Sequence, residues 1–141
     1  MRHFLDTSTL IAAFLETDQR HTECRALLLH MRPETAACAA HSFAEFYSVL
    51  TRLPAPLRLK PEQAWLLLED VHQRVTPIAL TSTEYFREMR RIAQSQILGG
   101  QVYDAIILAA ARKCDADRIY TVNLRHFQSL APDLASRITT P

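Results

Sequence analysis

The sequence predicts an α/β protein in which helices cover a central parallel sheet. Short apolar runs of β character alternate with longer helical runs along the whole chain, and this order is typical of strands joined by crossover helices. No internal repeat or linker interrupts the alternation. A length of 141 residues suits one domain with a core of its own. We therefore expect a single domain over residues 1–141 with four to five strands.

The opening residues predict a strand followed by two helices. Residues 3–6 form the first expected strand, and Ser8 or Thr9 is the expected N-cap of a helix over the apolar residues 10–15. A second helix is expected over residues 21–31, because a proline follows it and cannot continue a helix.

The next section predicts a buried strand and two more helices. The small residues 36–40 are compatible with a strand covered on both faces, despite their weak β propensity. Ser42 and Glu45 have the spacing of a capping box, which predicts the start of a helix that runs to about residue 52. Pro61 suits the first turn of the following helix, which we expect to reach about residue 72.

The third strand is expected over residues 75–80. Thr81 and Glu84 repeat the capping-box spacing directly after it, so a helix should begin there and continue to about residue 96.

The last section begins at the only two glycines. Gly99 and Gly100 predict a loop before an apolar helix over residues 102–113. The fourth strand is expected over residues 119–122, with a short helix after it, and an edge strand over residues 137–139.

Composition and charge exclude several classes of protein. Lys plus Arg number 16 and Asp plus Glu number 15, so a net charge of +1 gives no general attraction to nucleic acid or to a membrane. A nucleic-acid partner would need a local basic patch. The three cysteines form no CxxC pair and lie in apolar stretches, which predicts reduced, buried thiols. With no signal-peptide pattern and no apolar run of spanning length, we expect a cytoplasmic protein with no membrane partner.

Acid or amide side chains occur where three of the predicted strands end. Asp6 closes the first strand, Glu45 lies in the first turn of the helix after the second, and Asn123 follows the fourth. Asp104 lies in the first turn of the helix that begins after the glycines. Because ligands of open parallel sheets gather beyond the carboxyl ends of the strands, we expect these four side chains to share one rim.

Three carboxylates at one rim need a compensating charge, because like charges raise one another's pKa. Hard oxygen ligands without paired His or Cys favour Mg²⁺ or Mn²⁺, and such an ion supports hydrolysis of a phosphodiester bond. Each acid also has a structural interpretation. Asp6 suits an N-cap, Glu45 suits the end of a capping box, and Asp104 suits the positive end of a helix dipole.

Four stretches surround these residues, in an order that spreads over nearly the whole chain: FLDTSTL at 4–10, AEFYSVL at 44–50, VYDAIILAAA at 102–111 and YTVNLRHF at 120–127. Together they resemble the PIN domain, in particular the VapC toxins of bacterial toxin–antitoxin systems. The resemblance implies a three-layer α/β/α sandwich around a parallel sheet. It also implies a metal-dependent endoribonuclease whose products carry 5′-phosphate and 3′-hydroxyl ends.

The resemblance assigns roles to the residues at the rim. Asp6, Glu45 and Asp104 match the acids that hold Mg²⁺ or Mn²⁺ in the family. Many PIN domains have a fourth acid where this chain has Asn123, so the amide removes one charge from a second metal site. Asn123 is still expected to ligate through its oxygen or to orient a water.

Three hydroxyl residues match small polar residues that the family places near the acids. We expect Thr7, Ser8 and Thr121 to supply hydrogen bonds to the carboxylates. A plain role in a helix cap or a strand is the alternative for each hydroxyl. His126 is a candidate general acid, although a lone His before an aromatic residue also suits packing or the surface.

RNA would be held by arginines, and the predicted positions permit a local basic patch made by Arg87, Arg90, Arg91 and Arg125. Solvation of a helix face is the competing explanation. The resemblance also implies a homodimer and a cognate VapB-like antitoxin whose C-terminal segment obstructs the acidic site.

Two other functions fit parts of the pattern. In phosphatases with an aspartate nucleophile, the catalytic motif also begins with an Asp at the end of a strand. That motif needs a second Asp two residues later, where this chain has Ser8. A catalytically weak or inactive PIN-like module that binds RNA or protein is the stronger alternative, because Asn123 replaces an acid.

Overall fold

A computed structural model describes residues 2–141 and contains one five-stranded parallel sheet. Its strand order is β3-β2-β1-β4-β5, and all four pairings are parallel. The strands are β1 (His3–Leu5), β2 (Ala36–Ala39), β3 (Thr76–Ile78), β4 (Arg118–Tyr120) and β5 (Ile138–Thr139). The predicted parallel sheet of four to five strands is confirmed.

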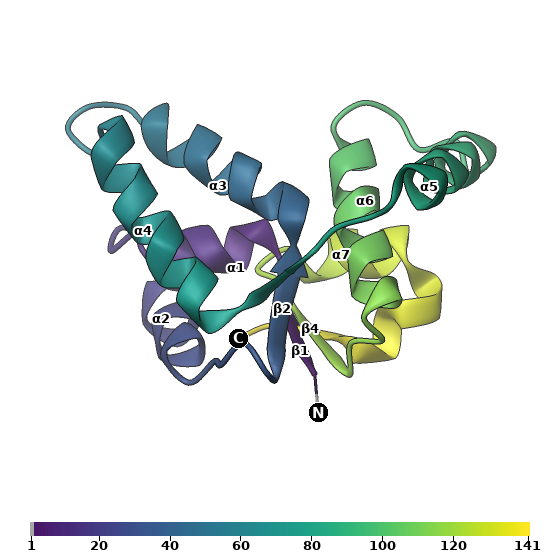
Figure 1. The fold of residues 1–141 in the computed structure, drawn as a ribbon, viewed down its shortest axis with the longest axis horizontal. Coiled ribbons are helices and arrows are strands. Elements are labelled where there is room, and N and C mark those ends of the chain that lie inside the picture. Colours follow the sequence, from purple (N-terminus) through teal and green to yellow (C-terminus); the bar gives the residue numbers. More distant parts are fainter. Residues whose placement is uncertain (1) are drawn as a thin grey trace.

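Helices cover both faces of this sheet, as Figure 1 shows. One layer contains α1 (Thr7–Ala12), α2 (His21–Leu29), α3 (Ala40–Thr51) and α4 (Pro61–Arg74). The other contains α5 (Ser82–Gln94), α6 (Gln101–Lys113) and α7 (Leu124–Leu130), which a 3₁₀ helix (Pro132–Arg137) follows. The molecule is therefore the predicted three-layer sandwich. No helix in the described part of the chain is long and apolar enough to cross a membrane.

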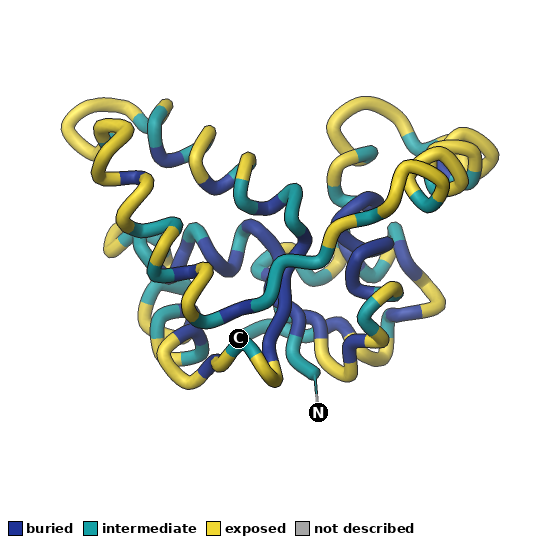
Figure 2. Tube along the Cα trace, viewed as in Figure 1, coloured by how far each residue is buried: buried dark blue, intermediate teal, exposed yellow. Residues whose placement is uncertain are grey.

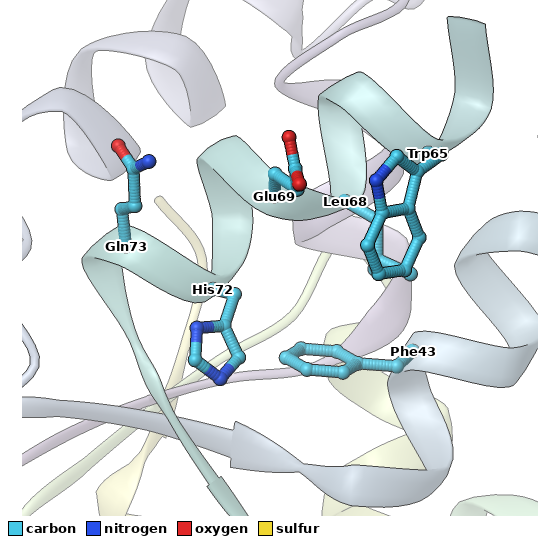
Figure 3. A pocket seen from close by; sticks show the side chains of 6 residues that line it. All are labelled: Phe43, Trp65, Leu68, Glu69, His72 and Gln73. Atoms are coloured by element: carbon cyan, nitrogen blue, oxygen red, sulfur yellow. The ribbon is translucent and has the colours of Figure 1, made fainter. Parts of the chain in front are cut away.

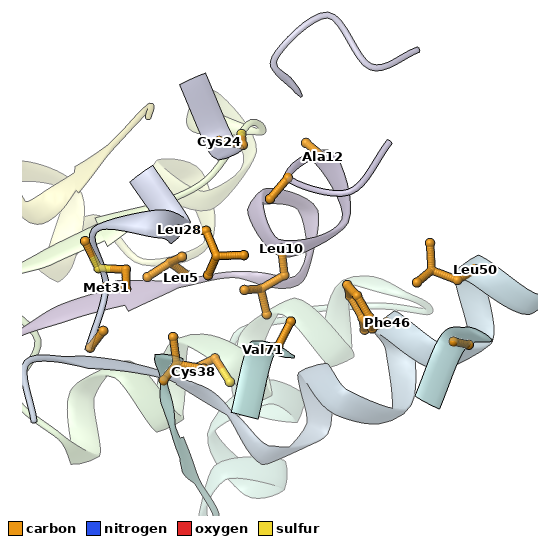
Figure 4. Packing of buried hydrophobic residues seen from close by; sticks show 14 residues of the cluster. Leu5, Leu10, Ala12, Cys24, Leu28, Met31, Cys38, Phe46, Leu50 and Val71 are labelled. Atoms are coloured by element: carbon orange, nitrogen blue, oxygen red, sulfur yellow. The ribbon is translucent and has the colours of Figure 1, made fainter. Parts of the chain in front are cut away.

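Alternating side chains of the strands supply two separate cores, because successive residues of a strand point to opposite faces. Leu5 of β1 and Cys38 of β2 pack against α1 to α4, in the cluster that Figure 4 shows. Phe4 and Ala37, their neighbours in the chain, pack with Ile119 of β4 against α6 and α7. Figure 2 shows the same pattern, with buried residues on the strands and on the inner sides of the helices. Small residues in β2 let helices approach both of its faces closely.

The chain reverses its direction across the sheet beside β1, and this positions the functional rim. From β1 the chain adds β2 and β3 on one side, and it then returns to add β4 and β5 on the other. The connection that follows β1 therefore runs to one side of the sheet and the connection that follows β4 runs to the other. A crevice opens between them at the carboxyl ends of these two strands. Asp6 follows β1 directly and Thr121 follows β4 directly, so both residues lie in this crevice.

Two predicted helix starts are wrong, because residues earlier in the chain than the predicted ones serve as the N-caps. The N-cap of α1 is Asp6, whose carboxylate accepts from the Thr9 N–H, so the helix begins at Thr7 and neither Ser8 nor Thr9 caps it. Helix α3 follows β2 without a loop and has Ala39 as its N-cap. The predicted capping box between Ser42 and Glu45 is therefore absent. The capping box of α5 is confirmed, with reciprocal bonds between Thr81 and Glu84.

Candidate active site

Asp6 is a buried acid held by hydrogen-bond donors. Its Oδ1 accepts from the Thr9 N–H at 2.9 Å and from Ser8 Oγ at 2.7 Å, and its Oδ2 accepts from Thr121 Oγ1 at 2.8 Å. Burial raises the pKa of the Asp6 carboxyl, while these donors act in the opposite direction. Every one of these contacts donates a proton to the carboxylate, so together they fix its orientation.

Glu45 lies on the second turn of α3, where it faces α1. Thr7 Oγ1 is 3.3 Å from Glu45 Oε1 and 2.9 Å from the buried Ser42 Oγ, so one hydroxyl proton serves two acceptors. Burial raises the pKa of the Glu45 carboxyl, His41 lowers it, and the negative charges of Asp104 and Asp6 raise it again. The three predicted acids are therefore close enough to interact through their charges.

Asp104 lies in the first turn of α6, as predicted, and is paired with a histidine. His126 Nε2 of α7 is 2.8 Å from Asp104 Oδ2. The His126 side chain is 37% exposed and that of Asp104 is 30% exposed, so the pair lies at the surface of the rim. His126 is thus a partner of a candidate ligand, and its packing against Phe127 does not account for its position alone.

Asn123 is the exposed N-cap residue of α7. Its backbone N–H donates to Thr121 Oγ1 at 3.0 Å, which links it to the Asp6 network. Its side chain makes no capping bond. The amide is therefore free of the structural role that a polar residue at a helix start usually has.

All three predicted hydroxyl residues contact the acids. Ser8 and Thr121 donate to Asp6, and Thr7 bonds to Glu45. Ser8 Oγ also accepts from the Val122 N–H at 3.3 Å, which leaves its proton for the carboxylate. Two of these residues belong to α1 and the third follows β4, and their bonds fix the orientation of the Asp6 and Glu45 carboxylates.

The donor set fits a hard divalent cation. Carboxylate oxygens are the ligands that Mg²⁺ and Mn²⁺ prefer. Burial and then the charges of Asp104 and Asp6 raise the pKa of Glu45, and a bound cation would offset both effects. Glu45 Oε2 and Asp104 Oδ1 bond to no residue among 2–141. Within that range, no three His, Cys, Asp or Glu side chains are already gathered closely enough to hold an ion directly. The acids share a rim but do not form a closed cage.

His41 is a neighbour of the acids that the sequence interpretation missed. Its Nε2 is 3.4 Å from Glu45 Oε1, and its ring stacks on Tyr103. The available signal was the spacing of four residues between His41 and Glu45, which places both on one helix face once α3 is known to begin at Ala40.

The four predicted RNA-binding arginines lie on two elements, three of them on α5 and Arg125 on α7. Arg91 bonds to Glu88 at 3.0 Å, and Arg87 lines a groove with Lys113 at the far end of α6 from Asp104. Arg90 and Arg125 are exposed, and Arg125 is next to His126 in α7. Arg125 is thus the one of the four whose place in the chain adjoins the rim.

A cavity of about 470 Å³ lies between α3 and α4, away from the acids. As Figure 3 shows, its lining is mostly aromatic and apolar, and includes Phe43, Trp65, Leu68, Glu69, His72 and Gln73. It contains a single carboxylate, that of Glu69, and none of the predicted acids. The cavity therefore offers no second acidic site.

Fold and rim together define an α/β/α protein with acids at the switch point of a parallel sheet. The family model of the PIN domain matches residues 3–131. The chain is 39% identical over 113 residues to Ribonuclease VapC27 of Mycobacterium tuberculosis, covering 80% of this chain and 79% of that protein. It is 33% identical over 123 residues to Ribonuclease VapC40 of the same species, with 85% of each chain covered. The chain belongs to the PIN domain family and, within it, to the VapC ribonucleases.

Solved structures of VapC proteins share this fold. VapC20 of M. tuberculosis, described as a toxin that cleaves the sarcin-ricin loop, matches with a TM-score of 0.70 at 17% identity, over 90% of this chain and 94% of that one. VapBC2 of Rickettsia felis, bound to a DNA fragment from its promoter, matches with a TM-score of 0.66 at 18% identity, over 99% and 98% of the two chains.

Proposed function

We propose that this protein is a metal-dependent endoribonuclease and the toxin of a VapBC-type toxin–antitoxin pair. The observation that carries the proposal is the placement of three acids at the carboxyl edge of the sheet: Asp6 caps α1, Glu45 bonds to Thr7 of that helix, and Asp104 lies in the first turn of α6. Membership of the VapC ribonucleases supports RNA as the substrate. A cluster of coupled acids in a crevice is also the arrangement expected of a catalytic site.

Asp6, Glu45 and Asp104 would hold Mg²⁺ or Mn²⁺. When bound, the ion would offset the charge of the scissile phosphate and promote attack by water. Thr121 and Ser8 orient the Asp6 carboxylate and act to lower the pKa that burial raises, and Thr7 does the same for Glu45. Hydrolysis of the bond between phosphorus and the 3′ oxygen leaves 5′-phosphate and 3′-hydroxyl ends.

Asn123 and Arg125 complete the proposed assignment. The free Asn123 amide would ligate or orient a water at the rim, and it contributes no charge. Arg125 would bind a phosphate of the RNA beside Asp104 and its partner His126.

Protein partners form the second part of the proposal. VapBC complexes are among the structural neighbours, so we propose a VapB-like antitoxin and a homodimer. Large exposed apolar side chains support such partners: Trp65 is 56% exposed and Leu66 63% on α4, and Phe86 is 80% exposed on α5.

Incubation of the purified protein with total RNA, with Mn²⁺ or with EDTA, tests the activity. We expect cleavage with Mn²⁺ only, and loss of at least about 100-fold in rate for Asp6→Asn, Glu45→Gln and Asp104→Asn. Glu34→Gln, at an exposed acid before β2, is the matched control and should cleave normally. RNA binding without cleavage by the wild-type protein would favour the inactive binding module.

A further inference from the structure

A groove of about 350 Å³ runs along α3 and opens beside the acids. Its floor is one face of α3, which carries His41, Glu45, Ser48 and Arg52 at spacings of four, three and four residues. Tyr103 of α6 forms the opposite wall. In Figure 1, α3 and α6 lie on either side of the sheet's upper end. Glu45 itself lines the groove, so the groove begins at one of the three candidate acids.

Tyr103 presents an aromatic ring to this groove. The His41 ring stacks on it, with 5.4 Å between the centroids and 13° between the planes. Tyr103 is nevertheless 52% exposed, so ring surface stays open to solvent. Glu45 pairs with His41 at 3.4 Å and so holds the imidazole against the tyrosine. A braced, exposed aromatic ring is a platform on which an unpaired nucleobase stacks.

Arg52 places a positive charge at the far end of the same groove. It is exposed and forms no salt bridge with any other residue in the range 2–141. Arg52 lies seven positions after Glu45, which corresponds to about 10 Å along the helix axis. An unpaired guanidinium at this distance suits a phosphate near the one being cleaved. The groove therefore combines an acid, a stacking ring and a cation.

We propose that this groove is a subsite for single-stranded RNA, in which a base next to the scissile phosphate stacks on Tyr103 and a neighbouring phosphate binds Arg52. The inference rests on the proposed ribonuclease function, because it names how that substrate is held. Tyr103 and Arg52 are then substrate-binding residues and take no part in the chemical step. The contact of His41 with Glu45 positions the platform.

The stacking platform is tested with Tyr103→Leu and Tyr103→Phe. For a fluorescein-labelled single-stranded oligoribonucleotide in EDTA, we expect anisotropy to show a Kd about tenfold or more higher for Tyr103→Leu and within about twofold of wild type for Tyr103→Phe. With Mn²⁺, KM should rise by the same factor while kcat stays within about threefold. Tyr47→Leu is the matched control, because Tyr47 is an exposed α3 tyrosine outside the groove.

The phosphate contact is tested with Arg52→Ala. Its Kd for the same oligonucleotide should depend less steeply on salt, with a slope of log Kd against log salt that is lower by about 0.7, as expected for one lost phosphate contact on a single strand. Arg32 is an exposed arginine before β2, so it lies at the amino ends of the strands, opposite the acids. Arg32→Ala should therefore keep the wild-type slope.

The two proposals fail in distinguishable ways. If Tyr103→Leu binds and cleaves RNA as Tyr47→Leu does, the proposed RNA subsite is wrong, and a protein partner becomes the expected occupant of the groove. Cleavage by the wild type would still support the ribonuclease proposal. If the wild type cleaves nothing but its affinity for the oligonucleotide depends on Tyr103, the ribonuclease proposal is wrong and RNA binding in the groove is supported. An unchanged salt slope for Arg52→Ala contradicts the phosphate contact.

Discussion

Thr121 Oγ1 donates a 2.8 Å hydrogen bond to Asp6 Oδ2 across 115 residues of sequence. The bond exists because β1 and β4 are parallel neighbours that end at the same edge, with Leu5 paired to Tyr120. Both side chains are buried, with Thr121 at 0% and Asp6 at 2% exposure. The contact therefore ties the central acid of the site to the strand pairing that creates the crevice.

Removal of this hydroxyl should weaken both the fold and the site. In Thr121→Val, Asp6 loses a donor and the Asn123 N–H loses its acceptor, while the side chain keeps its shape. We expect a loss of about 1–3 kcal/mol in the free energy of unfolding, measured by urea denaturation, together with slower RNA cleavage. Thr121→Ser should stay close to wild type. Thr83→Val, at an exposed helix position, is the control, and an equal loss there would contradict this explanation.

The fold was predictable because the alternation of strands and helices is continuous along the chain. Even the weakest predicted strand, the small residues 36–40, is present as Ala36–Ala39. Its place at the second position of the sheet explains the composition, because bulky side chains there would push the helices away from both faces.

Local capping motifs predicted the helix starts less well than the strands. Ser42 matches a capping box in sequence, but the structure uses its hydroxyl as the acceptor for Thr7 of another helix. Ser8 similarly donates to Asp6 and does not cap α1. For Ser42 the partner is 35 residues away, and a motif of four residues contains no information on it. For Ser8 the partner is Asp6, two residues earlier, which itself caps the helix.

The position of the rim could be predicted from the order of the strand ends, but the contacts of the histidines beside it could not. Asp6 and Thr121 are placed by the parallel pairing, which the sequence pattern predicts. The bond between His126 and Asp104 depends on how α7 packs beside α6. His41 joins the site only because α3 begins three residues before the predicted start, with Ala39 and not Ser42 as its N-cap. Such contacts depend on helix packing, for which the sequence has no local signal.

Glu45→Gln should separate stability from activity. Burial and the charges of Asp104 and Asp6 give Glu45 a folded-state pKa above its ordinary 4.5, so the folded metal-free protein holds this proton more tightly than the unfolded chain does. The stability linked to this group is complete below pH 4.5 and is lost as the pH rises through the raised pKa. Because glutamine does not ionise, the Glu45→Gln variant does not lose this stability as the pH rises. In EDTA at pH 7 its Tm should exceed that of wild type by a few degrees, with no cleavage activity.

The pH dependence provides the check. Differential scanning fluorimetry from pH 7 to pH 4 should show the difference in Tm between Glu45→Gln and wild type shrinking as the wild-type carboxyl becomes protonated. Glu34→Gln should match wild type over the whole range. A Tm for Glu45→Gln that is lower than wild type at pH 7 would show that the contacts with Thr7 and His41 outweigh the repulsion.

His126 should act on the site through Asp104. His126→Ala leaves Asp104 without the partner that is 2.8 Å from its Oδ2, so the carboxylate is no longer oriented. We expect the Mn²⁺ concentration for half-maximal cleavage to rise about 10- to 100-fold. His126→Gln, which places an amide N–H near the same oxygen, should restore part of the affinity. His72→Ala, at the cavity between α3 and α4, is the control. An unchanged Mn²⁺ requirement in His126→Ala would contradict a positioning role.

Buried thiols should report on global unfolding. Burial raises the pKa of Cys24 and of Cys38 to about 12, so at pH 8 only about one molecule in 10⁴ carries the thiolate at either position, and both side chains are fully enclosed. Cys114 is partly exposed. In pulsed alkylation with iodoacetamide read by mass spectrometry, Cys114 should therefore be labelled first. Cys24 and Cys38 should be labelled together, at the denaturant concentration where the fold is lost. Cys24 lies in α2 and Cys38 in β2, and both belong to one core, so labelling of Cys24 before Cys38 would mean that α2 opens independently of the sheet.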